Sequence, residues 1–473
     1  MKNDHVALWD RVLGTAAEHA LAFTAGIDDR PVAPSATVGQ LRKLLGGGLP
    51  DQPDDAADVV SLLARAGRTG TMASAGPRFF GFVMGGALPA AVGTDWLVSA
   101  WDQNAAAYVP SPVASVAEEV VADWILELLG LPPHCSVGFV TGGQMATYTA
   151  LATARHHLLA RTGWDVETRG LRRSPGLTVL ATEERHASVD RAIRLLGIGT
   201  AALRTVPCDG QGAIDPDVLA AALDAVDGPT IVCVQAGNIN TGAVDPLDRV
   251  CAIAHEHDAW VHVDGAVGLW AMASPQVRPR FAGAERADSW STDAHKWLNT
   301  PYDCGIVICA HPDQHRATTG ITAPYIVISD ERDEFEWTPE WSRRARSLPL
   351  YAAMRSLGRS GIVDLVDRCC AHARRFARHF DPIAGIHVLN DVVLNQVLVR
   401  FRDPDGGHDR LTDDVVRRVQ DEGTCWVGGT VWQNQHAMRI SVCNWSTTED
   451  DVDRSVAAIV AAYHDALTAR GKP

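Results

Sequence analysis

The sequence predicts an α/β fold with a mostly parallel central sheet and a smaller α+β subdomain toward the carboxyl end. Between residues 137 and 264, short and continuously apolar runs alternate with helical stretches, which is typical of a parallel sheet covered by helices on both faces. After about residue 347 this alternation stops, so a separate α+β subdomain is expected there. A chain of 473 residues is also too long for one simple core, which favours several packed parts.

The expected elements follow from apolar patterning and from the positions of glycine and proline. Residues 1–75 mix short apolar helices with a Gly-Pro-rich stretch at 46–53, so we expect a helical packing arm. An apolar helical stripe from Val120 to Leu129 follows two glutamates and ends at Gly130. The elements expected next are a strand at 137–140, a helix from Gly143 toward Leu159, a strand at 177–181, helices at 189–196 and 216–226, a strand at 230–235, a helix at 247–257 and a strand at 260–264.

The carboxyl-terminal part mixes helices and strands in a different order. Its expected elements are a long helical stretch, a strand within 393–401, a helix at 413–421, an apolar segment at 426–431, a strand at 438–442 and a last helix. Ser446 and Glu449 have the spacing of a capping box for that last helix. We therefore expect an arm at 1–75, a large α/β domain at 76–350 and an α+β subdomain at 351–473.

Composition and charge exclude several classes of protein. The formal net charge is −15 and no long basic run occurs, which argues against a nucleic-acid or anionic-membrane surface. No apolar stretch approaches the roughly 20 residues that span a bilayer, and the first residues lack the apolar core of a signal peptide, so we expect a cytoplasmic protein. The ten cysteines show no CxxC spacing, so neither a metal site nor a disulfide framework is expected, and most of them should be buried.

Lys296 is the candidate for covalent chemistry. It is the only lysine between Lys43 and Lys472, although the chain has 42 basic side chains. Arginine can replace lysine in most ion pairs, but only a lysine amine can lose its proton and form a Schiff base with an aldehyde. Asp264 ends an apolar strand 32 residues before Lys296. A lysine Schiff base together with an aspartate at a pyridinium nitrogen is the signature of pyridoxal 5'-phosphate.

A phosphate site is expected where Gly143 and Gln144 open a helix. The order of strand, glycine turn and helix leaves free backbone N–H groups at a positive helix end, which can hold a phosphate. In an open α/β sheet, ligands bind beyond the carboxyl ends of the strands. Gly143, His186, Asp264 and Lys296 are all expected at that edge.

In these residues the chain resembles the group II pyridoxal-phosphate-dependent amino acid decarboxylases, which include the aromatic amino acid, glutamate and diaminobutyrate decarboxylases. The most specific motifs are His-Val-Asp-Gly-Ala at 262–266 and Asp-Ala-His-Lys-Trp-Leu at 293–298. The resemblance extends from about Pro77 to the end of the chain. It implies a fold type I enzyme that binds pyridoxal phosphate and forms a homodimer with shared active sites.

The resemblance also implies catalytic roles for four residues. Lys296 resembles the lysine that forms the Schiff base, and Asp264 resembles the aspartate that keeps the pyridine nitrogen protonated. His186 is similar to the histidine that stacks on the cofactor ring and approaches the substrate carboxylate. Tyr325 follows Lys296 by 29 residues, the interval at which the decarboxylases carry a loop tyrosine that protonates the substrate carbon.

Other positions match cofactor contacts. Ala266 should pack on the ring face opposite His186. Gly143, Gln144 and His295 correspond to the phosphate contacts of the family. Arg439 lies where fold type I enzymes often bind a carboxylate, but a structural ion pair is an equally good interpretation of that arginine.

Three regions depart from the animal aromatic amino acid enzymes. Asp293 replaces an asparagine beside the phosphate, where a carboxylate would be repelled unless it turned away or bonded to a donor such as His295. Ile239, in a loop near the phenolic oxygen of the cofactor, cannot donate a hydrogen bond, so Asn238 or Asn240 would have to do so. The segment at 101–104 is closer to the diaminobutyrate branch, so the resemblance specifies no particular substrate.

The sequence therefore predicts α-decarboxylation of an L-amino acid to its amine and carbon dioxide. Alternatives on the same scaffold are an aldolase or lyase that breaks another bond at the α-carbon, and an aldehyde synthase that couples decarboxylation to oxidative deamination. Tyr325 favours the decarboxylase over the aldehyde synthase, which usually has Phe at this position. A non-catalytic binding protein is a further alternative, and the joint presence of Lys296, Asp264, His186 and Tyr325 argues against it.

Overall fold

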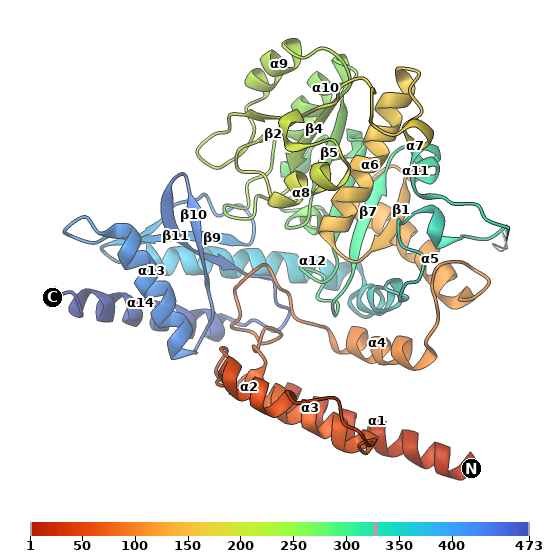
Figure 1. The fold of residues 1–473 in the computed structure, drawn as a ribbon. Coiled ribbons are helices and arrows are strands. Elements are labelled where there is room, and N and C mark those ends of the chain that lie inside the picture. Colours follow the sequence, from red (N-terminus) through yellow and green to blue (C-terminus); the bar gives the residue numbers. More distant parts are fainter. Residues whose placement is uncertain (1, 325–329, 472–473) are drawn as a thin grey trace. The chain divides into compact units, whose positions relative to one another are not determined.

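The computed structural model describes residues 2–324 and 330–471 (Figure 1). The chain divides into two compact units. The first contains the residues up to Gly81, Arg400–Met438 and the residues from Ser446 onward, and the second contains Phe82–Val399 and Arg439–Trp445. The domain boundaries expected near residues 75 and 350 stay a prediction, because a compact unit need not fold independently. No helix among the described residues is both long enough and apolar enough to cross a membrane.

The second unit contains a seven-stranded sheet, so the prediction of an α/β fold is confirmed. Its strand order is β1-β7-β6-β5-β4-β2-β3. The strands are β1 (Ser136–Val140), β2 (Thr178–Thr182), β3 (Leu203–Val206), β4 (Thr230–Gln235), β5 (Trp260–Asp264), β6 (Ser289–Asp293) and β7 (Gly305–Cys309). The pairs among β3, β2, β4, β5 and β6 are parallel, while β7 is antiparallel to both β1 and β6. The sheet is therefore mostly parallel, as expected, with one reversed strand.

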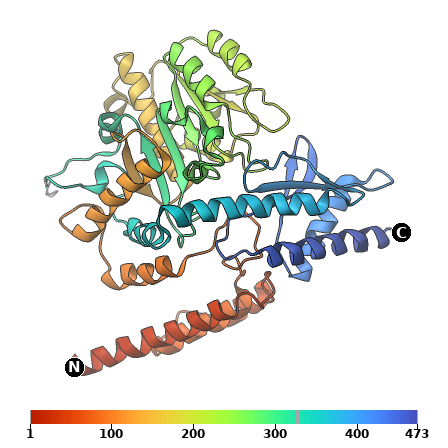
Figure 2. The same cartoon turned by 180° about the vertical axis from the view of Figure 1, so that it is seen from behind.

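Helices surround this sheet. They are α4 (Pro89–Trp101), α5 (Pro112–Leu129), α6 (Gly143–Arg161), α7 (Val166–Arg169), α8 (Ala187–Leu195), α9 (Pro216–Asp224), α10 (Leu247–Glu256), α11 (Pro312–Thr319) and α12 (Ser347–Phe380), with 3₁₀ turns η1 (Thr200–Ala202), η2 (Leu269–Ala273), η3 (Arg278–Phe281), η4 (Ala284–Arg286) and η5 (Glu334–Glu336). Buried side chains of α6 and α8 pack on β2, β4 and β5 in one apolar core. Figure 2 shows the long second segment of α12, which follows a break at Gly358, where φ is 62°.

The first unit contributes the amino-terminal helices and part of the carboxyl-terminal region. Its helices are α1 (Lys2–Ala25), α2 (Val38–Leu45), α3 (Ala56–Gly70), α13 (His408–Glu422) and α14 (Glu449–Thr468). The second sheet of the chain has the order β10-β11-β9-β8, formed by β8 (Ile386–Val388), β9 (Gln396–Phe401), β10 (Gly428–Trp432) and β11 (Gln435–Ser441). The predicted capping box of the last helix was wrong by two residues. Thr448 and Asp451 form it, because Thr448 is the residue that takes the extended N-cap conformation.

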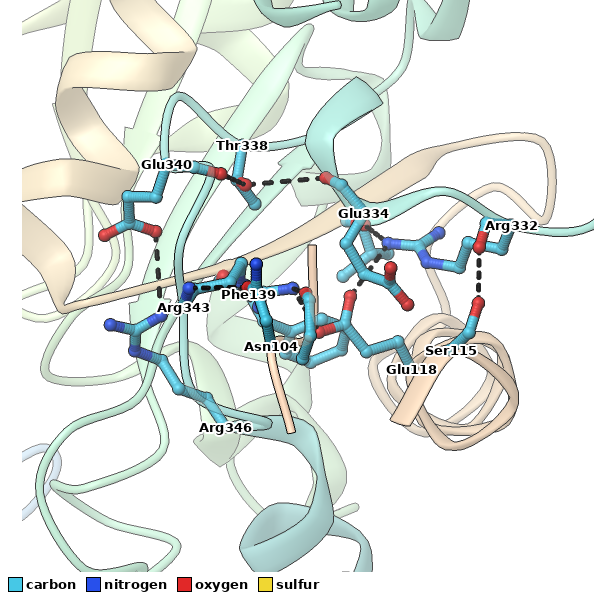
Figure 3. Close-up of polar contacts among 12 residues, drawn as sticks. Asn104, Ser115, Glu118, Phe139, Arg332, Glu334, Thr338, Glu340, Arg343 and Arg346 are labelled. Atoms are coloured by element: carbon cyan, nitrogen blue, oxygen red, sulfur yellow. Dashed lines mark hydrogen bonds and ion pairs between the residues drawn. The ribbon is translucent and has the colours of Figure 1, made fainter. Parts of the chain in front are cut away.

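A buried charge network fixes residues 332–346 against α5 and β1 (Figure 3). Helix α5 begins earlier than the expected 120–129, so Glu118 lies inside it and is fully buried. The Glu118 carboxylate pairs with Arg343 at 2.7 Å and with Arg332 at 3.5 Å. Arg343 also donates to the backbone oxygen atoms of Ala105 at 2.8 Å and Phe139 at 2.7 Å. Breaking such a buried pair leaves an uncompensated charge, so the segment is held firmly in place.

Candidate active site

The residues expected at the carboxyl edge of the sheet do lie at the ends of neighbouring strands. Asp264 is the last residue of β5, Asp293 is the last residue of β6, and Lys296 follows three residues later. Gly143 begins α6 three residues after β1, and His186 caps α8 after β2. The strands β1, β4, β5 and β6 are buried along their whole length. The turns that follow these strands are more accessible to solvent. His186 is exposed there, and the partly exposed residues are Lys296, Ala266, Gly143 and Gln144.

Lys296 is held by the carboxylate of Asp293. The distance between Lys296 Nζ and Asp293 Oδ2 is 2.9 Å. The other oxygen, Asp293 Oδ1, accepts a 2.6 Å hydrogen bond from the backbone N–H of Gly143, the first residue of α6, and lies 3.5 Å from Nε2 of His295. A carboxylate at a helix amino end is stabilised by the helix dipole. The structure therefore brings the predicted anchor lysine, the glycine turn and His295 together around one carboxylate.

His295 is fixed on its other side. Its Nδ1 atom accepts a 3.2 Å hydrogen bond from the backbone N–H of Cys304, and its ring lies 4.3 Å from the ring of Tyr302. Burial lowers the pKa of His295, while the charge of Asp293 opposes this shift. The ring thus presents Nε2 toward Asp293 and the amino end of α6.

Two groups contact the Asp264 carboxylate at the end of β5. The backbone N–H of Ala266 donates to Oδ1 at 3.1 Å, and the Ser188 hydroxyl lies 3.4 Å from Oδ2. Ser188 also contacts His186, whose Nδ1 lies 2.8 Å from the Ser188 hydroxyl and accepts a 3.2 Å bond from the Ser188 backbone N–H. Gln144 Nε2 donates to the backbone oxygen of Ser188 at 3.2 Å. Ser188 therefore connects His186, Asp264 and the start of α6.

The sequence did not single out Ser188, nor the polar side chains beneath Asp264. His262 lies fully buried on β5 between the hydroxyls of Ser289, 3.0 Å from Nδ1, and Ser291, 3.4 Å from Nε2. Burial lowers the pKa of His262 to about 4, so its ring is neutral near pH 7. His262 lies between apolar residues of β5, and Ser289 and Ser291 lie on either side of an apolar residue of β6, a pattern that could have indicated buried polar positions. Only the register between β5 and β6 shows that His262 contacts Ser289 and Ser291.

A loop before α4 contacts the backbone of Lys296. Phe82 and Val83 have left-handed φ angles of 53° and 58°, which cost energy, above all for a β-branched residue. A β-carbon on Gly85 would lie 1.8 Å from the backbone oxygen of Lys296 and 3.0 Å from Asn299 Cγ. Only glycine fits there. Gly85 therefore lies against the anchor segment itself.

The loop around Ile239 uses its asparagines locally. Asn238 is fully buried; its Nδ2 donates to the backbone oxygen of Glu184 at 3.0 Å, and its Oδ1 accepts from the backbone N–H of Asn240 at 2.8 Å. Asn240 Oδ1 accepts from Arg439 Nη1 at 3.5 Å. Within the described residues, Arg439 has no acidic partner, and burial lowers its pKa. An unpaired guanidinium of this kind favours a carboxylate ligand over the structural ion pair.

Tyr325 lies outside the described residues, so its role stays a prediction. The remaining predicted residues supply what pyridoxal phosphate requires: an amine at Lys296, a buried carboxylate at Asp264, and backbone N–H groups at a helix amino end next to His295. Asp293 is the one carboxylate that this set does not explain. The donor set therefore fits the cofactor, with Asp293 as an exception at the phosphate end.

Comparisons with known proteins place the chain in a family that uses this cofactor. Residues 39–402 match the pyridoxal-dependent decarboxylase conserved domain. Tyrosine decarboxylase of Oryza sativa subsp. japonica is 31% identical over 433 residues, which cover 85% of this chain and 79% of that protein. L-2,4-Diaminobutyrate decarboxylase of Rhizobium meliloti (strain 1021) is 26% identical, and the aligned residues cover 100% of this chain and 97% of that protein. The crystal structure of Oryza sativa TDC with PLP and tryptamine has a TM-score of 0.90 at 25% identity over 98% of both chains.

Proposed function

Because this chain belongs to the pyridoxal-dependent decarboxylase family, and so is a pyridoxal-phosphate-dependent amino acid decarboxylase, we propose that the residues gathered at the carboxyl edge of its sheet carry the reaction. The reaction releases carbon dioxide from the α-carbon of an L-amino acid and leaves the amine. The observation that carries this assignment is the position of Asp264 and of the Lys296 segment at the ends of the paired strands β5 and β6.

Bound pyridoxal phosphate supplies an electron sink for the electron pair that remains when the carboxylate leaves. Asp264 holds a proton at the pyridine nitrogen, with its own Oδ1 oriented by the backbone N–H of Ala266. Lys296 anchors the cofactor aldehyde. With the cofactor bound, His186 would cover one face of its ring and exclude water, and the small side chain of Ala266 would leave room on the other face.

The amino end of α6 is assigned as the binding site for the phosphate group of the cofactor. Gly143 and Gln144 provide backbone N–H groups there, and His295 provides Nε2. Tyr325 delivers the proton to the α-carbon, which completes the amine. Arg439 is a candidate for orienting a substrate carboxylate, since burial without an acidic partner among the described residues favours such a ligand.

The anchoring role has a direct test. Borohydride reduction of the purified enzyme, followed by peptide mapping, should place one pyridoxyl group on Lys296. A label on Lys43 or Lys472, or no label on cofactor-loaded protein, would contradict the assignment. Incubation with pools of amino acids, with detection of carbon dioxide, amines and aldehydes, then identifies the substrate. Aldehyde with ammonia in place of amine would favour the aldehyde synthase, and cleavage without carbon dioxide would favour the aldolase or lyase.

We also propose that the enzyme is a homodimer with shared active sites. Two separate sets of exposed apolar side chains support this. One set, on α1, is Val6, Leu8, Trp9, Leu13 and Leu21; the other, on α4, α5 and the loop between them, is Trp96, Leu97, Trp101, Val109, Val113 and Val116. Such surfaces suit an interface between identical subunits. Lys296→Ala chains and Tyr325→Phe chains should each fail to form amine alone, and mixing them should restore part of the amine formation, whereas no recovery after demonstrated subunit exchange would argue for sites built from one chain.

The cytoplasm is the compartment that we propose for the enzyme. Nine of its ten cysteines are buried as free thiols and the tenth is partly buried, which suits a reducing compartment. Cell fractionation with an antibody to the native chain would test this, and recovery in an oxidising compartment would contradict it.

A further inference from the structure

Asp293 carries a negative charge at the point where the phosphate is expected. Its side chain is only 2% exposed, and it contacts three groups: the Gly143 N–H at 2.6 Å, Lys296 Nζ at 2.9 Å and His295 Nε2 at 3.5 Å. Under the proposed function, Gly143 and His295 hold the cofactor phosphate and Lys296 holds its aldehyde. One carboxylate therefore contacts groups from both ends of the cofactor site.

The carboxylate cannot easily move away. The Asp293 backbone is paired with Gly305 in the sheet, and its carbonyl oxygen accepts a 3.0 Å bond from Trp270 Nε1. The turn also encloses the side chain, since a β-carbon on Gly143 would lie 2.7 Å from Asp293 Oδ2. A phosphate ester at the amino end of α6 must therefore bind beside a fixed carboxylate.

The consequence is electrostatic. A phosphate monoester carries about −1.5 to −2 charges near pH 7, and repulsion between like charges is strong beside a carboxylate that is itself buried. The carboxylate also occupies the first N–H group of α6, which a phosphate would otherwise use. Both effects oppose phosphate binding, and neither acts on the pyridine ring or on the aldehyde.

We propose that Asp293 tunes the retention of the cofactor: it competes with the phosphate for Gly143 and His295, so that the enzyme releases pyridoxal phosphate more readily than one with a neutral residue at this position. This inference rests on the proposed assignment of the phosphate contacts. Asp293 is a positioning residue here, because it acts through Gly143 and His295.

The test compares two forms of the cofactor. Wild-type and Asp293→Asn holoenzymes are first dialysed, and the loss of bound pyridoxal phosphate is followed by absorbance. The cofactor-depleted proteins are then titrated with pyridoxal phosphate and with pyridoxal, which lacks the phosphate. The variant should bind pyridoxal phosphate at least about tenfold more tightly, a difference of about 1.4 kcal/mol. Its affinity for pyridoxal should change by less than about threefold, because the carboxylate acts on the phosphate.

A matched control is Asp288→Asn, at the opposite end of β6. Asp288 is also a largely buried carboxylate, bonded to His311 at 2.8 Å, His255 at 3.2 Å and the backbone N–H of Val261 at 2.7 Å, and it lies outside the proposed site. Removing the Asp288 charge should leave the ratio of the affinities for pyridoxal phosphate and pyridoxal unchanged. Thermal melting of each variant checks the fold, and Asp293→Ser replaces Asp293→Asn if the latter melts early.

The outcomes separate the inference from the proposed function. Equal gains for pyridoxal and pyridoxal phosphate, no gain, or a loss with pyridoxal phosphate would overturn the role of Asp293. The same result from Asp288→Asn would also overturn it. Borohydride mapping on the same samples reports independently on the anchor: if Lys296 is labelled while the affinities do not change, the inference fails and the proposed function stands.

Discussion

Replacing Glu334 with glutamine should stabilise the protein at neutral and alkaline pH. Glu334 lies on η5 and is fully buried within the charge network of Figure 3. Burial raises the pKa of its carboxyl to about 7 from an ordinary 4.5, and the charge of Glu118 adds to this effect. Arg343 acts in the opposite direction, but its closest ion-pair contact is with Glu118 at 2.7 Å. Glutamine has nearly the shape of the protonated acid and cannot ionise.

The direction of the pH effect on stability follows from the pKa of Glu334, which is higher in the folded chain than in the unfolded chain. Below pH 4.5 the carboxyl is protonated in both the folded and the unfolded chain, so it contributes no pH dependence. Between pH 4.5 and about 7 the unfolded chain loses the proton while the folded chain keeps it, so stability falls as the pH rises. Above about pH 7 the carboxyl is ionised in both states, and the loss of stability is complete. At about 1.4 kcal/mol per pKa unit, it amounts to roughly 3 kcal/mol.

The assay is urea unfolding of wild type and Glu334→Gln at several pH values. The free energies of unfolding should agree near pH 4.5 and diverge to a gain of roughly 3 kcal/mol for the variant at pH 8. Glu336→Gln, on the same 3₁₀ turn, is the control, because Glu336 is more exposed and pairs with Arg316 at 3.1 Å. A constant difference across the pH range, or a less stable variant at pH 8, would refute the reasoning about Glu334.

Three further predictions concern the site. Asp264→Asn should keep the cofactor but lower turnover by about 10³-fold or more, roughly 4 kcal/mol in the barrier, as measured by carbon dioxide release; near-normal turnover would show that another group protonates the ring nitrogen. Gly85→Ala should lower turnover by about 100-fold, because its β-carbon would overlap the backbone oxygen of Lys296, whereas Gly93→Ala, which has open space around it, should not. Tyr325→Phe should bind cofactor and release carbon dioxide but lose amine formation; unchanged amine in product analysis would remove Tyr325 as the proton donor.

The parallel part of the fold could be predicted because its signals are local. The predicted bounds of the strands at 230–235 and 260–264 match β4 and β5, and the predicted helix ends lie within a few residues of those of α8, α9 and α10. The reversed strand β7 was not predicted. Its apolar run resembles that of any buried strand, and strand direction depends on long-range pairing that no short segment encodes. The capping box failed for a related reason, since two overlapping boxes were possible and the backbone selected one.

The same distinction between local and long-range signals holds for the residues of the candidate site. The sequence could single out Lys296 and Asp264 as candidates because their chemistry is rare and their spacing is specific. Ser188 could not be identified, because a serine two residues after a histidine is common, and only the fold brings it to Asp264. The sequence indicated that Asp293 was unusual, but its contacts with Gly143 and Lys296 depend on how the ends of β1 and β6 meet.

The cap that His186 forms on α8 also determines which nitrogen of its ring carries hydrogen. A backbone N–H can only donate, so the bond from Ser188 N to His186 Nδ1 makes Nδ1 an acceptor. The Ser188 hydroxyl, 2.8 Å from Nδ1, then gives its one hydrogen to Nδ1 rather than to Asp264, which is 3.4 Å away. In the neutral ring the hydrogen then resides on Nε2. His186 therefore presents an N–H donor, and no basic lone pair, to whatever lies against its exposed edge. An N–H donor at this edge suits an anionic group such as a carboxylate, so the helix cap favours one chemical role for this histidine.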